Sequence, residues 1–169
     1  MNFYRPAPYM QIEWTFPIKY KKLNWDKPTP ETKAIMNIID TAKPDFMYSL
    51  HNAGFGGVYY YVTDECKPIY DNLRRVARDR KLPLSLGEPE VPYVKQLSDG
   101  IYKMPTTRET YDYYEQYTDI DPAEAIRCGT SSDDYASTVA NTFTLVTEVP
   151  YFYNPLIEDT SLSHNLRLN

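Results

Sequence analysis

Segments with helical periodicity alternate along this chain with short apolar segments that favour strands. Residues 30–43 follow an N-cap candidate, Thr29, and begin with a proline and a glutamate, and their apolar residues recur at helical spacing, which predicts a helix. Residues 46–50 and 142–147 are rich in aromatic or β-branched residues and predict short buried strands. Residues 66–80 carry apolar residues on one face, which predicts an amphipathic surface helix. The alternation of helix and buried strand indicates an α/β sheet.

The remaining segments give weaker signals. Three further elements are expected: a strand over residues 58–62, a tyrosine-rich helix over residues 106–118 and a short helix that opens at residues 133–136. The stretches without a clear period are expected to be loops: residues 1–28, residues 82–105 and residues 119–130, the last with room for a short strand.

The composition limits the classes of protein and partner. With 169 residues the chain suits one ordinary domain rather than two complete enzymatic domains. Its 18 lysines and arginines against 23 aspartates and glutamates give a net charge of −5, which disfavours general nucleic-acid binding. No apolar run approaches the roughly 18 residues of a membrane span, and the first residues lack a signal-peptide pattern. Cys66 and Cys128 are expected to be ordinary thiols, although the two could pair.

Two titratable residues directly follow predicted strands. His51 comes after residues 46–50, and Glu148 comes after residues 142–147. In open α/β sheets, ligands bind beyond the carboxyl ends of the strands. An imidazole and a carboxylate at that edge suit a metal ligand and a general base. Strands also often end in polar residues without a function, so the pattern alone leaves both interpretations open.

Three segments of the chain carry a family resemblance. They are residues 44–52 (PDFMYSLHN), residues 129–135 (GTSSDDY) and residues 142–148 (TFTLVTE), in this order. They resemble the region of the third zinc ligand, the specificity loop and the catalytic-glutamate strand of the zinc carboxypeptidase (funnelin, or metallocarboxypeptidase) family. The resemblance covers most of residues 28–150. It implies an α/β fold with a mixed, mostly parallel sheet flanked by helices.

The resemblance also implies roles for individual residues. His51 would be a zinc ligand, and Glu148 would be the general base that deprotonates the zinc-bound water in hydrolysis of a C-terminal peptide bond. Asp133 would lie at the floor of the side-chain pocket, where an acid favours a basic terminal residue of a peptide substrate. Asp133 and Asp134 would equally suit the cap of a helix.

The chain departs from the family in its metal ligands. The family's His-x-x-Glu motif is absent, and the only other histidine is His164. Because catalytic zinc takes three protein ligands and a water, His51 alone would hold the ion poorly. We therefore expect residues 1–169 to be the C-terminal part of a single catalytic domain, inactive alone. It would need the missing N-terminal half or a second chain, or it would self-associate.

The second departure concerns the substrate. The family's Asn-Arg pair, which anchors the terminal carboxylate, has no clear match in this sequence. Arg127 or Arg5 could replace it. Two alternatives to a peptidase therefore stay open. One is a non-catalytic fragment or binding module on the same scaffold, and the other is a zinc amidase that acts on a non-peptide or cell-wall substrate.

Overall fold

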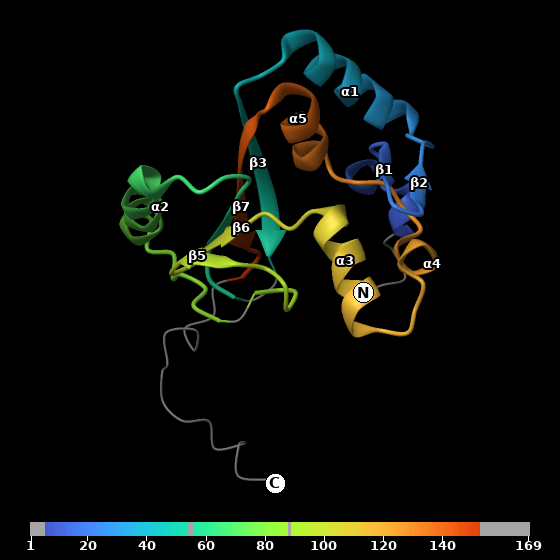
Figure 1. Ribbon diagram of the computed structural model, residues 1–169. Helices are drawn as coiled ribbons and strands as arrows, with labels where there is room; N and C mark the ends of the chain where they lie inside the picture. The colour runs from blue at the N-terminus through green and yellow to red at the C-terminus, as the bar shows by residue number, and fades with distance from the viewer. Residues whose placement is uncertain (1–5, 54–55, 88, 153–169) are drawn as a thin grey trace, which may run out of the picture.

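The computed structural model describes residues 6–53, 56–87 and 89–152 (Figure 1). These residues form an α/β structure with a mixed five-stranded sheet and a two-stranded hairpin. The helices are α1 (Pro30–Ala42), α2 (Lys67–Asp79), α3 (Thr107–Tyr117), α4 (Pro122–Ile126) and α5 (Ser132–Ala140), with short 3-10 turns η2 (Pro8–Met10) and η3 (Ile12–Trp14). The strands are β1 (Ile18–Tyr20), β2 (Leu23–Trp25), β3 (Phe46–Ala53), β4 (Tyr59–Val62), β5 (Gln96–Ser98), β6 (Ile101–Lys103) and β7 (Phe143–Pro150).

The large sheet has the strand order β3-β7-β4-β6-β5. β3 runs parallel to β7 and β4 parallel to β6, whereas β4 is antiparallel to β7 and β5 is antiparallel to β6. The expectation of a mostly parallel sheet is therefore wrong, although the α/β class and the mixed sheet are confirmed. The physical reason is the length of two connections. β4 follows β3, and β6 follows β5, after connections too short for the chain to return to the opposite end of the sheet, so the second strand of each pair runs in the reverse direction.

Helices cover both faces of the sheet. Figure 1 shows α2 on one side, and α1, α3, α4 and α5 on the other. α2 packs Tyr70 and Ala77 against Val62 and Ile101 of the sheet. On the opposite face, α1 and α5 close over Phe16, and this cluster includes Met47 of β3. Two apolar cores thus hold the sheet between its helices.

The predicted helix ends agree well with the structure. α1 begins after Thr29, whose side chain accepts a hydrogen bond from the backbone N–H of Thr32, and it ends at Lys43 in the left-handed conformation. The predictions for α2, α3 and the opening of α5 are confirmed as helices. All three loop predictions are wrong in part. Residues 18–25 form the β1-β2 hairpin, residues 96–98 and 101–103 form β5 and β6, and residues 122–126 form α4.

β3 differs from its prediction in burial. The strand extends three residues beyond the predicted range, so that His51 lies within it. It was expected to be buried, but Phe46, Tyr48 and Leu50 are exposed by 55%, 55% and 65%. β3 lies at the edge of the sheet and α2 packs nearer to β4 and β6, so one face of β3 stays open.

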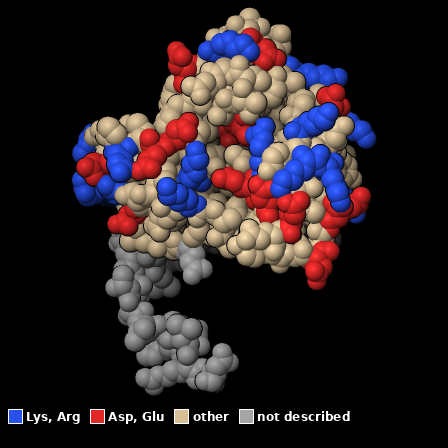
Figure 2. All heavy atoms as spheres, viewed as in Figure 1, with Lys and Arg blue, Asp and Glu red and all other residues tan. Residues whose placement is uncertain are grey.

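The surface charges are of mixed sign, and the two cysteines are unpaired, as expected from the sequence. Figure 2 shows basic and acidic side chains interspersed over the visible face, without a large region of one sign. Cys66 and Cys128 are both free thiols. No helix in the part of the chain that the structure describes is long and apolar enough to span a membrane.

Candidate functional site

β3 and β7 bring His51 and Glu148 together. The strands are parallel neighbours, and their register pairs His51 directly with Glu148. Residues that are opposite each other in adjacent strands point to the same face of the sheet. Nδ1 of His51 lies 3.1 Å from Oε1 of Glu148, within hydrogen-bond distance. The two residues predicted to form the site, 97 positions apart in the sequence, are therefore in direct contact.

The environment of this pair favours a charged imidazole. The Glu148 side chain is 10% exposed, whereas His51 is 48% exposed. The hydrogen bond with Glu148 raises the pKa of His51 above its usual value, and partial burial opposes this change. When Nδ1 carries a proton it donates to Glu148, which leaves the other ring nitrogen to bind a ligand. Metal-binding histidines commonly share a proton with a carboxylate in this way.

The pair lies in a polar pocket of about 600 Å³. The lining residues come from η3, from the ends of β3 and β7 and from the loop before β5: Glu13, Trp14, His51, Asn52, Glu90, Glu148 and Tyr151. Three carboxylates and one histidine thus line the pocket, and neither lysine nor arginine is among its described lining residues. By charge alone the pocket attracts cationic groups and repels a carboxylate.

Glu90 is a pocket residue that the sequence analysis missed. It comes from the region of residues 82–105, where no periodic pattern singles out any side chain. Its position is fixed by Tyr59, whose hydroxyl donates a hydrogen bond to Oε1 of Glu90. Tyr59 is paired in register with Glu148. Burial raises the pKa of the Tyr59 hydroxyl, and the hydrogen bond with Glu90 raises it further. Tyr59 therefore links the glutamate from the loop to the strand that carries Glu148.

Asp133 lies in the first turn of α5 and is only 8% exposed. Burial raises the pKa of its carboxyl. Oδ2 of Asp133 has no hydrogen-bond partner among the residues that the structure describes. The adjacent Asp134 has a structural role instead, because it accepts from Arg108 at 2.8 Å and from Thr130 at 2.5 Å. Of the two acids, Asp133 is thus the one with an unsatisfied oxygen, but that oxygen is buried and Asp133 is not among the residues that line the pocket around His51.

Arg127 is directed elsewhere. It caps the end of α4 and donates hydrogen bonds to the backbone oxygen and the carboxylate of Glu124. Its side chain is 71% exposed, and it is not among the residues that line the pocket around His51. The other basic candidate, Arg5, and the second histidine, His164, lie outside the described residues.

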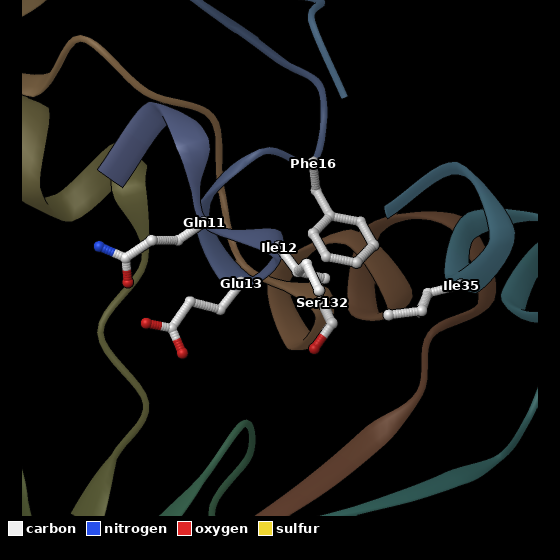
Figure 3. A pocket seen from close by; sticks show the side chains of 6 residues that line it. All are labelled: Gln11, Ile12, Glu13, Phe16, Ile35 and Ser132. Carbon is white, nitrogen blue, oxygen red and sulfur yellow. The ribbon is translucent and has the colours of Figure 1, made fainter. Parts of the chain in front are cut away.

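A second hollow of about 420 Å³ adjoins the first, because Glu13 lines both. Figure 3 shows Glu13 on one side of it and Phe16 and Ile35 on the other, with Ile12 and Ser132 between them. Ser132 directly precedes Asp133. The hollow therefore leads from the His51 pocket toward the start of α5.

The described residues do not complete a zinc site. Imidazole nitrogen and carboxylate oxygen are suitable donors for zinc, but a catalytic site takes three protein ligands. Within residues 6–53, 56–87 and 89–152, no group of three or more histidine, cysteine, aspartate or glutamate residues is placed to hold a metal ion. His51 and Glu148 thus fit one part of such a site only.

Comparisons with known proteins give no independent assignment. The chain matches no protein-family model, no curated protein sequence and no solved structure.

Proposed function

We propose that this chain contributes His51 and Glu148 to the site of a zinc-dependent peptidase of the metallocarboxypeptidase type. The observation that carries the proposal is the direct pairing of these residues, 3.1 Å apart at the carboxyl ends of two parallel strands. Bound zinc would supply Lewis-acid activation of a water. The remaining ligands would come from polypeptide outside the described residues, either a further segment or a second chain.

In this proposal the two residues have distinct tasks. His51 would hold the ion through its second ring nitrogen, and its Nδ1–H would donate a hydrogen bond to Glu148. Glu148 is the general base, because a mostly buried carboxylate beside a half-exposed imidazole can take a proton from water and later pass it to a leaving amine. The isolated chain is expected to be inactive, since its described residues supply one histidine only.

The test is a zinc titration of the full chain followed by NMR of the histidine rings. We expect weak binding that shifts the His51 signals with rising zinc concentration, and His51→Ala identifies those signals by removing them. His164→Ala is the matched control, because it removes the only other histidine and should leave the response intact. If the His51 signals ignore zinc while the chain remains folded, the metal role of His51 is wrong.

Asp133 would select the substrate side chain. Its buried carboxyl has one oxygen without a partner among the described residues, which supports recognition of a basic group. The complete enzyme should hydrolyse substrates with C-terminal lysine faster than those with C-terminal phenylalanine. Asp133→Asn should reduce that preference. A preference for phenylalanine in the unmodified enzyme would contradict this role.

Two other functions each have a specific observation in their favour. The absence of a third metal donor among the described residues favours a non-catalytic binding module on the same scaffold. The pocket lining is acidic, and Arg127, the candidate anchor for a carboxylate, is hydrogen-bonded to Glu124 instead. Both observations favour a zinc amidase whose substrate has no terminal carboxylate. Comparison of one substrate as its free acid and as its amide would separate the amidase from a carboxypeptidase.

A further inference from the structure

The edge strand β3 leaves both its backbone and one side-chain face uncovered. Within the part of the chain that the structure describes, β3 pairs only with β7, so its other edge presents free N–H and C=O groups. On one face the strand exposes Phe46, Tyr48 and Leu50 by 55%, 55% and 65%. We call this edge with these three side chains the β3 surface. It combines unpaired hydrogen-bonding groups with apolar area, and both favour association.

β3 lacks the features by which soluble proteins protect sheet edges. Its eight residues, FMYSLHNA, include no lysine, arginine, aspartate, glutamate or proline. Its register with β7 is continuous from Phe46 to Ala53, without a bulge that would twist the edge away. Edge strands that stay free usually carry at least one such feature. The β3 surface is therefore suited to pairing with another strand.

The apolar area continues from the β3 surface toward α2. An apolar hollow of about 440 Å³ lies between the sheet and this helix, and its apolar lining includes Phe46, Phe143, Leu145, Leu73 and Val76. Phe46 and Phe143 stack with ring centres 6.2 Å apart. α2 therefore covers the middle of the sheet and leaves the β3 side open.

We propose that the β3 surface binds the same surface of a second copy of this chain, with the two β3 strands antiparallel about a two-fold axis at Tyr48. Directly opposite residues in antiparallel strands lie on one face. This register places Tyr48 opposite Tyr48, and Phe46 opposite Leu50 of the second copy. All six exposed side chains then share one face, and the two sheets become continuous. A shift by one residue would put the two apolar sets on opposite faces.

Charge complementarity and symmetry favour a second copy as the partner. The same register places Asp45 of each copy opposite His51 of the other, and both side chains are exposed or half-exposed. The three apolar side chains each expose roughly 100 Å², which is less than half of the about 800 Å² per partner of a standard interface and fits a dimer that dissociates on dilution. The edge backbone and Val76, which is 49% exposed, add to this area. One chain thus supplies a self-complementary surface.

Sedimentation velocity of the full chain over a dilution series tests the pairing. We expect a monomer–dimer equilibrium, and Leu50→Lys should weaken dimerisation at least about tenfold, because it places a lysine on the edge strand. The matched control is Ile38→Lys. Ile38 is equally exposed, at 64%, but lies on α1 across the sheet, so dimerisation should not change. Circular dichroism checks that each variant is folded.

Cysteine cross-linking tests the register. In a background with Cys66 replaced by serine, diamide oxidation of Tyr48→Cys should give a covalent dimer, because the two residues 48 lie opposite each other. Leu50→Cys should give none, because it faces residue 46. A chain that stays monomeric at every concentration would overturn the proposal. So would association that Leu50→Lys leaves unchanged, or a dimer that cross-links through position 50 rather than 48.

Discussion

The contact between His51 and Glu148 sets the protonation chemistry of the site. A carboxylate that is 10% exposed has lost most of its water, and a protonated imidazole restores part of that solvation. Glu13 and Glu90 add negative charge around the same pocket. The pocket thus stabilises the imidazolium form of His51, and a cation that binds there competes with the proton.

We predict that His51 titrates above its usual pKa, and that Glu148→Gln lowers the value, because the hydrogen bond with Glu148 is the largest cause of the rise. Since the pKa of folded His51 exceeds that of the unfolded chain, the stabilisation is full below the unfolded pKa. It is lost as the pH rises through the folded pKa. NMR titration of the ring protons measures both variants, with His164→Ala to assign the signals. Equal pKa values with and without the Glu148 carboxylate would contradict the prediction.

The pocket residues differ in how well the sequence predicts them. His51 and Glu148 are predicted because each follows a run of strand-forming residues. Glu13 and Glu90 are not predicted, because neither has a periodic neighbourhood. Tyr59 holds Glu90 by a hydrogen bond across 31 positions of the chain. Such a pairing depends on the fold and leaves no local pattern.

At the scale of elements, the helices carry their own start signals. α3 begins with a capping box, in which Thr106 accepts from the backbone N–H of Glu109 and the Glu109 side chain accepts from the backbone N–H of Thr106. These contacts lie within four residues. The helix is therefore predictable from its sequence, even though it is rich in tyrosine, which is not a strong helix former.

Thr106→Ala should destabilise the protein by about 1 kcal/mol, because the first turn of α3 loses the side-chain acceptor for one of its free N–H groups. Urea denaturation followed by circular dichroism gives the free energy of unfolding. Thr106→Ser is the control, since it keeps the hydroxyl and should retain most of the stability. An alanine variant as stable as the serine variant would show that the cap contributes little.

The short strands, unlike the helices, cannot be predicted from their local sequence. β5 and β6 have three residues each, and they lie in a proline-containing stretch without a clear period. They form because β6 pairs with the edge of β4, and β5 in turn pairs with β6. Their hydrogen-bond partners are supplied by tertiary structure, so their local sequence does not identify them.

At the scale of the whole molecule, residues 14–16 of the N-terminal segment are hydrogen-bonded to residues 129–130. Phe16 and Thr130 form an isolated bridge, and the backbone N–H of Gly129 donates to the carbonyl of Trp14 at 2.8 Å. A Cβ atom at position 129 would lie 2.1 Å from the carbonyl oxygen of Phe16. Glycine is required here for the close approach of two backbones.

Gly129→Ala should therefore destabilise the fold by at least about 2 kcal/mol, since backbone atoms cannot yield as a flexible side chain can. Thermal unfolding measures the effect. Gly87→Ala is the matched control, because a Cβ there meets nothing within 4 Å and stability should change little. A melting temperature equal to that of the control would mean that the contact between residues 16 and 129 is not tight in solution.

Local sequence patterns are enough to predict the α/β class, the positions of α1, α2 and α3, and the candidate residues His51 and Glu148. These follow from periodicity, caps and strand-forming runs, which act over a few residues. The strand directions, the short strands, the exposure of β3 and the acidic pocket are visible in the folded structure alone. Each of these depends on which segments become neighbours, and that is fixed by packing between residues far apart in the chain.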